Sequence, residues 1–301
     1  VVEEWVSKKE AHVVYALAPG EYILHEEQVP TEQGYVRAED VKFVVEETGD
    51  VQKVKMEDDH TKVSISKTDI TDGKEIEGAK LQILDQDGEV VESWTTGEEH
   101  LIEYLPVGTY TLHEEAAVDG YIVANDVEFT VEETGEIQKV KMEDERAMGQ
   151  LVIVKTDTDS KAALEGVEFV LLEKETGKEV GRLKTGKDGK AVSELLPIGT
   201  YENGVFKEPI TYVLKETATL KGYEKTEKEW EIVFTYQNDK TPVIEVVKEI
   251  QNKKIPETPG TVKPGPKTGD DTNWFLPLLA LGVSAGMVAG LLYYRKRHKK
   301  A

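Results

Sequence analysis

Three polar side chains stand where strand-like segments should present hydrophobic ones. Because side chains alternate between the two faces of a strand, Lys155, Glu216 and Asn252 each share a face with apolar neighbours. Buried lysine and glutamate are rare unless they are paired, so we expect the three to meet inside one small sandwich. The alternating sets are Leu151, Ile153 and Lys155; Tyr212, Leu214 and Glu216; and Ile244, Val246, Ile250 and Asn252.

A lysine, a glutamate and an asparagine in buried contact could form a covalent bond. Desolvation lowers the pKa of a lysine and raises that of a carboxyl group, which favours a neutral amine beside a carboxylic acid. The amine of Lys155 could then attack the side-chain amide carbon of Asn252. Glu216 would polarise the amide carbonyl and carry a proton to the departing ammonia. The pattern therefore predicts a Lys155–Asn252 isopeptide bond promoted by Glu216.

A second set of the same kind lies earlier in the chain. Lys67 stands in "KVSISKTD", Glu114 in "YTLHEE" and Asp144 in "VKMEDE". An aspartate can form the same bond with loss of water, but it must be neutral to be attacked. We predict a Lys67–Asp144 bond promoted by Glu114.

The N-terminal residues carry an incomplete third set. Glu26 and Asp58 match Glu114 and Asp144, but nothing after Val1 matches the lysine strand. We expect a "KTD"-like strand shortly upstream of Val1, in a longer protein of which this chain is a C-terminal part. Without that strand the N-terminal piece should have an unpaired sheet edge.

These sets recur because the sequence repeats itself. "ALAPGEYILHEEQVPTEQGY" (16–35) matches "YLPVGTYTLHEEAAVDGY" (104–121), and "YVLKETATLKGY" (212–223) belongs to a more diverged copy. The predicted divisions are a truncated first repeat (1–58), a second repeat (59–146), a third repeat (147–254), a Pro-rich spacer (255–272), a membrane helix (273–294) and a basic cytoplasmic tail (295–301).

Short alternating runs separated by Gly, Asp and Asn turns predict all-β sandwiches. "DQDGE" at Asp85 and "GKDGK" at Gly186 are typical of hairpin turns. An insertion around "ENGVFKEPI" (202–210) favours a longer hairpin over a ligand-contacting loop.

Composition excludes several classes of function. The formal net charge of −22 disfavours a nucleic-acid partner, and the absence of cysteine excludes disulfides and thiolate metal sites. The repeated histidines beside glutamates, such as His25 and His113, alternate away from the inner face, so we predict exposed positions and no metal. No nucleotide loop or nucleophile elbow is present. We expect no cofactor and no enzymatic activity beyond self-cross-linking.

The C-terminal region has the composition of a membrane anchor. The stretch 274–294 contains no charged residue and is about as long as the ~20 residues that a spanning helix needs. "RKRHKK" (295–300) follows it, which predicts a cytoplasmic tail and an extracellular location for everything before the span.

The repeats resemble CnaB-type domains, the B-type repeats of collagen adhesins and Gram-positive pilins. The resemblance rests on "VIVKTD", "LEGVEF", "LPIGTY", "YVLKETATLKGY" and "EIQNKK" in the third repeat, and on "SISKTD", "IEGAKL" and "LPVGTY" in the second. It implies tandem prealbumin-like (inverse immunoglobulin) sandwiches of stalks or adhesins. It also implies that Glu216, in the family's E-box, is the isopeptide-promoting residue.

The C-terminal region resembles a cell-wall sorting signal with an LPxTG-like motif. "GPKTG" has Gly265 where leucine is usual, followed by Pro266, Lys267, Thr268 and Gly269. The resemblance implies a sortase and a peptidoglycan precursor as partners, cleavage after Thr268, and a membrane span that is only transient. The expected location is the Gram-positive cell wall.

The leading interpretation is a structural or adhesive surface protein whose cross-linked repeats act as a stalk. The alternatives are the C-terminal carrier region of a large surface enzyme whose catalytic domain lies upstream, and a pilus subunit. A host matrix protein or other pilin subunits would then be bound through the upstream region.

Overall fold

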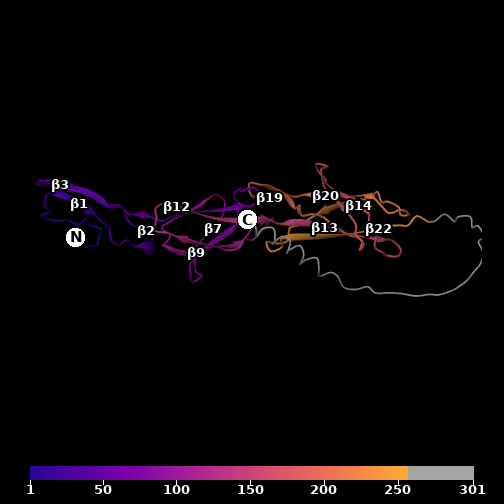
Figure 1. Ribbon diagram of the computed structural model, residues 1–301, viewed down its shortest axis with the longest axis horizontal. Helices are drawn as coiled ribbons and strands as arrows, with labels where there is room; N and C mark the ends of the chain where they lie inside the picture. Colours follow the sequence, from indigo (N-terminus) through magenta and orange to yellow (C-terminus); the bar gives the residue numbers. More distant parts are fainter. Residues whose placement is uncertain (257–301) are drawn as a thin grey trace, which may run out of the picture. The chain divides into compact units, whose positions relative to one another are not determined.

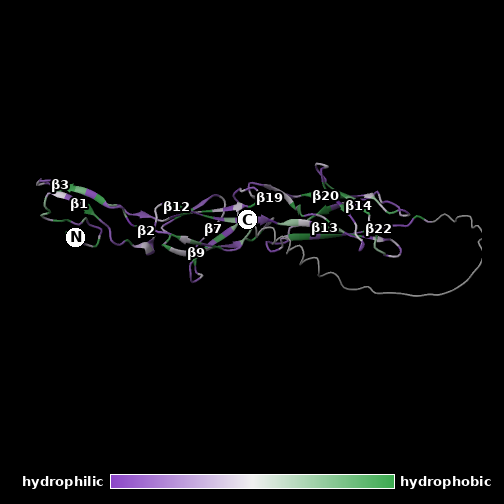
Figure 2. Ribbon diagram, in the orientation of Figure 1, coloured by the Kyte–Doolittle hydropathy of each residue, from purple (hydrophilic) through white to green (hydrophobic). Residues whose placement is uncertain are grey.

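The computed structural model describes residues 1–256, where regular secondary structure is nearly all strand. Within these residues one short 3-10 helix, η1 (Thr31–Gln33), is the exception. The strands follow the alternation of the sequence: β20 (Thr211–Ala218) alternates half-buried and buried residues from Thr211 to Glu216. Figure 2 shows hydrophobic and hydrophilic residues interspersed along the strands. No helix in residues 1–256 is both long and apolar enough to span a bilayer.

The second repeat consists of two four-stranded sheets, in the orders β10-β12-β5-β8 and β11-β9-β6-β7. Their facing sides bury one hydrophobic cluster that includes Ile65, Leu81, Leu112 and Met142. Its strands are β5 (Lys62–Asp69), β6 (Lys80–Leu84), β7 (Val90–Thr95), β8 (His100–Glu103), β9 (Gly108–Ala116), β10 (Tyr121–Ile122), β11 (Val127–Val131) and β12 (Ile137–Arg146).

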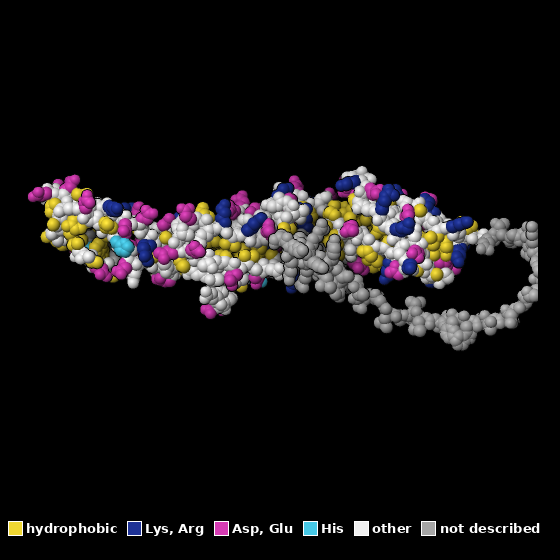
Figure 3. All heavy atoms as spheres, in the orientation of Figure 1, with side chains coloured by type: hydrophobic (Ala, Val, Ile, Leu, Met, Phe, Trp, Pro, Cys, Tyr) yellow, Lys and Arg dark blue, Asp and Glu magenta, His cyan; other side chains and the backbone are white. Residues whose placement is uncertain are grey.

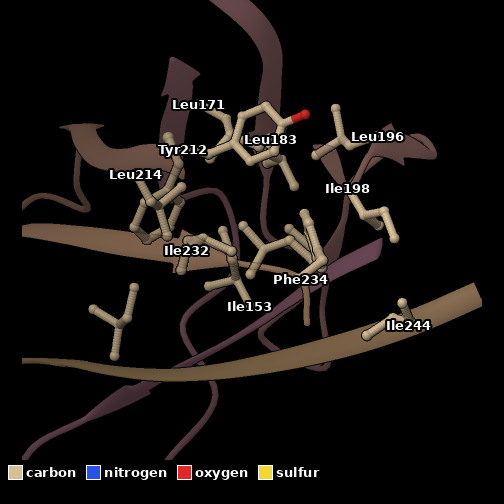
Figure 4. Close-up of a cluster of buried hydrophobic side chains, with 14 of the residues drawn as sticks. Ile153, Leu171, Leu183, Leu196, Ile198, Tyr212, Leu214, Ile232, Phe234 and Ile244 are labelled. Carbon is tan, nitrogen blue, oxygen red and sulfur yellow. The ribbon is translucent and has the colours of Figure 1, made fainter. Parts of the chain in front are cut away.

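The third repeat has the same two-layer plan. One sheet contains β16, β13, β17 and β22, and the other has the order β15-β14-β20-β21. Between the sheets lies a hydrophobic core in which Ile153, Leu171, Tyr212, Leu214 and Phe234 pack together (Figure 4). Besides β20, its strands are β13 (Met148–Asp157), β14 (Glu168–Glu173), β15 (Glu179–Lys184), β16 (Lys190–Val192), β17 (Leu196–Pro197), β18 (Gly199–Glu202), β19 (Val205–Pro209), β21 (Glu229–Val233) and β22 (Val243–Asn252).

The first and last strands of each complete repeat lie side by side and parallel. β13 pairs with β22 along its whole length, and the register places Asp157 opposite Asn252. Figure 1 shows the two strands next to each other. β5 pairs with β12 in the same way, with Asp69 opposite Asp144. Side chains two positions apart share a face, so Lys155 and Asn252 project to the same side of the sheet.

The first repeat lacks a comparable core. β1 pairs with β3 and β2 with β4, which gives only two-stranded sheets. Val36 is its one buried hydrophobic side chain within residues 1–60, whereas Val2, Val6 and Tyr15 are exposed. Figure 3 shows hydrophobic side chains at the surface in this part of the chain. The strands are β1 (Gly20–Leu24), β2 (Tyr35–Val36), β3 (Val41–Val45) and β4 (Asp59–His60).

Two of the three predicted hairpins are present, and one is not. Asp85 lies in the turn between the paired strands β6 and β7, and the inserted segment forms the hairpin of β18 and β19. The prediction at Gly186 was wrong. The turn closes through the bond from the Gly186 N–H to the Lys190 carbonyl, but β15 and β16 belong to different sheets. A tight turn specifies a reversal of direction, and packing decides which sheet receives the next strand.

Candidate functional site

In the third repeat the structure brings Lys155, Glu216 and Asn252 into direct contact. The Lys155 Nζ lies 2.9 Å from Glu216 Oε2 and also donates to Asn252 Oδ1. The Asn252 amide donates to Glu216 Oε1 over 2.7 Å and to Thr219 Oγ1 over 2.8 Å. The three predicted side chains therefore form a closed hydrogen-bonded triangle.

The strands of two sheets position this triangle. Lys155 comes from β13 and Asn252 from its parallel neighbour β22, while Glu216 reaches across from β20 in the facing sheet. The exposed fraction is 0% for Lys155, 2% for Asn252 and 4% for Glu216. The Lys155 Nζ also lies 5.8 Å from the centre of the Phe169 ring, so apolar groups surround the polar contacts.

Burial sets the chemistry of the lysine. Desolvation lowers the pKa of Lys155, and the hydrogen bond and charge of Glu216 oppose this only in part. A neutral amine is therefore more accessible at Lys155 than at a solvated lysine. The amine donates to the carboxamide oxygen of Asn252, so the two groups that nucleophilic attack would join are adjacent.

The second repeat holds the matching cluster of Lys67, Glu114 and Asp144. The Lys67 Nζ lies 2.9 Å from Glu114 Oε2 and donates to Asp144 Oδ1. The backbone N–H of Ala124 donates to Glu114 Oε2 over 2.6 Å. The three side chains are buried, and they come from β5, β9 and β12, the counterparts of β13, β20 and β22.

This cluster contains a second carboxyl group in place of the amide. The pKa of Asp144 is raised to about 7, chiefly by burial and also by the nearby charge of Glu114, while Lys67 lowers it in part. In the part of the chain that the structure describes, Glu114 Oε1 and Asp144 Oδ2 have no hydrogen-bond partner. Close to neutral pH, Asp144 is thus readily converted to the acid, the form that an amine can attack.

The structure does not complete a cluster in the first repeat. Glu26 Oε2 accepts from the backbone N–H of Ala38 over 3.0 Å, as Glu114 accepts from Ala124. Asp58, however, is exposed and lies outside the strands. The predicted pair of Glu26 and Asp58 is not brought together within the described residues.

Comparison with known families identifies the fold. The model of the SpaA family, a prealbumin-like fold domain, matches residues 61–146 and 149–250, more than half of the chain. The chain belongs to this family. The predicted fold class, tandem prealbumin-like all-β sandwiches, is confirmed for the described residues, and the SpaA model describes a structural domain.

Several solved structures resemble the chain. The Bacillus anthracis TIE protein matches with 29% identity and a TM-score of 0.49 over 79% of this chain and 42% of its own. A streptococcal ancillary pilin matches with 19% identity and a TM-score of 0.30 over 80% of this chain and 77% of its own. A minor pilin of Streptococcus agalactiae matches with 20% identity and a TM-score of 0.29 over 68% of this chain and 100% of its own. No curated protein matches the sequence.

A polar network beside the cluster of the second repeat was not predicted from the sequence. In the second repeat Asp69 Oδ2 accepts from the Tyr121 hydroxyl over 2.7 Å and from Arg146 Nε over 2.6 Å. Burial opposes ionisation of Asp69, but the Thr71 N–H, Tyr121 and Arg146 together hold its pKa below the usual value. The signal was the aspartate of the "KTD" motif and the tyrosine of the "GY" pair, which recur in both complete repeats.

The histidines lie in ordinary side-chain contacts. His25 Nδ1 lies 2.6 Å from Asp40 and His113 Nδ1 2.7 Å from Asp126, and both histidines are exposed by more than a third. No group of three metal-ligating side chains occurs within residues 1–256.

The predicted sorting motif (Pro266, Lys267, Thr268 and Gly269), the membrane stretch 274–294 and the basic tail 295–300 lie outside the described residues.

Proposed function

We propose that the chain is a structural subunit of a bacterial cell surface or pilus, whose SpaA-type repeats are closed by internal isopeptide bonds. The observation that carries this proposal is the buried contact of Lys155 with Asn252, beside Glu216. Each partner of the bond comes from an end strand of the sandwich, β13 or β22. The second cluster, built on Lys67 and Asp144, repeats the arrangement.

The reaction in the third repeat is an amide exchange. The neutral Lys155 amine attacks the Asn252 side-chain carbon and forms a new C–N bond. Glu216, in contact with both groups, takes a proton from the attacking nitrogen and returns one to Asn252 Nδ2. The bond between the Asn252 carbon and Nδ2 then breaks, and ammonia leaves. No cofactor enters this balance.

The reaction in the second repeat differs in its leaving group. Lys67 attacks the acid form of Asp144, with Glu114 as the proton carrier, and water leaves. The product is the same amide, so the two repeats acquire equivalent cross-links.

A bond between the first and last strands suits a load-bearing domain. Lys155 and Asn252 are separated by 97 positions, and Lys67 and Asp144 by 77. By the chain-entropy model for disulfides, closing a loop of about 100 residues stabilises a fold by ~4.7 kcal/mol. A pull on both ends of the third repeat would also be carried by covalent bonds, because β13 could not separate from β22.

Mass spectrometry of the purified chain tests the cross-links. We expect the third repeat to be lighter by one ammonia and the second by one water. Branched proteolytic peptides should carry Lys155 joined to Asn252, and Lys67 joined to Asp144. Separate, unlinked peptides that carry Lys155 and Asn252 would contradict the proposal for the third repeat.

Anchoring to peptidoglycan by a sortase is the second part of the proposal, and its support is the sequence of residues 265–301. A sortase cysteine would attack the Thr268 carbonyl, release Gly269 and transfer the chain to a wall-precursor amine. After muramidase digestion, wild-type protein should be in the wall fraction and the Thr268→Ala variant in the membrane fraction. Wild-type protein that remains in the membrane with residues 270–301 attached would contradict sorting.

A further inference from the structure

The amide of Asn252 is held in one orientation by partners on both sides. Its Nδ2 donates to Glu216 Oε1 over 2.7 Å and to Thr219 Oγ1 over 2.8 Å, while its carbonyl oxygen accepts from Lys155. Thr219 is half-buried and follows the end of β20 directly. Both N–H groups of the nitrogen that has to leave are thus paired, and Thr219 supplies one of the two acceptors.

The second repeat lacks this hydroxyl. Thr219 is the third residue after Glu216, and the third residue after Glu114 is Ala117. The residue that the lysine would attack there is Asp144, whose Oδ2 has no hydrogen-bond partner within the described residues. The third repeat therefore has a threonine at this position and an amide that must release ammonia. The second repeat has an alanine at this position and a carboxyl group that must release water.

We propose that Thr219 is a leaving-group residue for the Lys155–Asn252 cross-link, an inference that rests on the proposed function. Its Oγ1 holds the Asn252 amide so that the carbonyl faces the lysine and the nitrogen faces Glu216. When the Lys155–carbon bond has formed, Nδ2 gains a proton through Glu216 and has more N–H groups to place. Thr219 accepts from one of them as the carbon–nitrogen bond breaks and ammonia leaves.

The rate of ammonia loss in the full chain tests this role. Unlinked chains, isolated unfolded in urea, are refolded by dilution, and the mass of the third repeat is followed over time. Thr219→Val keeps the size of the side chain but removes the oxygen, and Thr219→Ser keeps the oxygen. We expect Thr219→Val to lose ammonia roughly tenfold more slowly, as for one hydrogen bond lost in the transition state, and Thr219→Ser to stay near the wild-type rate.

The second repeat provides an internal control, because its cluster contains no hydroxyl at Ala117. Water loss there should be unchanged by either Thr219 substitution, which separates a local effect from slow refolding of the whole chain. Equal rates for wild type and Thr219→Val would overturn the role of Thr219 alone. A wild-type third repeat that keeps its full mass would overturn the cross-link and with it this role.

A gain of function tests the same idea independently of how Thr219 variants fold. Asp144→Asn gives the second repeat an amide, and Asp144→Asn with Ala117→Thr adds the hydroxyl. We expect the double variant to lose ammonia from the second repeat roughly tenfold faster than Asp144→Asn alone. Equal rates in the two variants would contradict the proposal.

Discussion

The second and third repeats place the same lysine and glutamate in the same strands but differ in the residue that the lysine faces. Lys155 faces the amide of Asn252, every polar atom of which is paired. Lys67 faces the carboxyl group of Asp144, one oxygen of which has no partner within the described residues. In the third repeat, all polar atoms of the attacked side chain are therefore hydrogen-bonded. In the second repeat, one oxygen of the attacked side chain lacks a hydrogen-bond donor.

The same fold could therefore form the same amide product from two different side chains. An amide is ready for attack at any pH at which the amine is neutral. A carboxyl group must first be protonated, and the burial that raises the pKa of Asp144 to about 7 makes this possible near neutrality. The leaving group thus determines how each repeat should respond to substitution and to pH.

Substitution of Glu216 should abolish one cross-link and leave the other intact. Glu216→Ala removes the proton carrier of the third repeat, so we expect this repeat to keep its full mass while the second still loses water. Intact-mass measurement after limited proteolysis separates the two. Glu208→Ala, at an exposed position of the same repeat, is the matched control and should cross-link normally. Ammonia loss in the Glu216→Ala chain would show that this carboxyl group is not needed.

Next in size is the stability that the bond supplies. Asn252→Ala prevents the bond but leaves the ion pair of Lys155 and Glu216 in place. By the chain-entropy model, the free energy of unfolding of the third repeat should fall by ~4.7 kcal/mol, measured by urea denaturation. The exposed neighbour Gln251 provides the control, since Gln251→Ala should change stability little. A fall no larger than in that control would mean that the two strands are not covalently joined.

The two repeats should respond differently to pH. The lowered pKa of Lys155 means that raising the pH increases its neutral fraction, so ammonia loss should accelerate. Asp144, with its pKa raised to about 7, loses its attackable acid form as pH rises through that value. This loss opposes the gain in neutral amine, so water loss should increase with pH less than ammonia loss does. The gain in ammonia loss approaches about tenfold per pH unit below the pKa of Lys155, where the neutral amine is the minor form. Refolding at several pH values, followed by mass, measures both rates in one chain, and parallel profiles would contradict the assignment.

The smallest effect concerns the network of Asp69, Tyr121 and Arg146 beside the second cluster. Arg146 donates to buried Asp69 over 2.6 Å, whereas the counterpart in the third repeat, Lys254, is exposed and lies 5.9 Å from the Tyr223 ring centre. We expect Arg146→Met to destabilise the second repeat by about 2 kcal/mol, as for a hydrogen bond to a charged group, and Lys254→Met to have a much smaller effect on the third. Thermal unfolding monitored repeat by repeat compares the two. Equal shifts would show that the Asp69 network adds nothing specific.

The strands and the inward direction of the reactive side chains could be predicted from the residue pattern. The alternation of Tyr212, Leu214 and Glu216 depends only on the backbone geometry of one strand, which neighbouring residues dictate. The repeats and the "KTD" motifs, through their resemblance to CnaB-type domains, likewise indicated tandem prealbumin-like sandwiches before any contact was known. These features are local, so they can be deduced without knowledge of the packing.

Tertiary structure alone decided the distances and the environments. The parallel register of β13 and β22 places Lys155 within hydrogen-bond reach of Asn252, and no local pattern specifies pairing between strands so far apart in the chain. No local pattern predicted the contact of Thr219 with Asn252 either. Nor did the turn at Gly186 reveal that the next strand, β16, belongs to another sheet. The pKa of Asp144 depends on burial between two sheets, which is a property of the packed interior rather than of any segment.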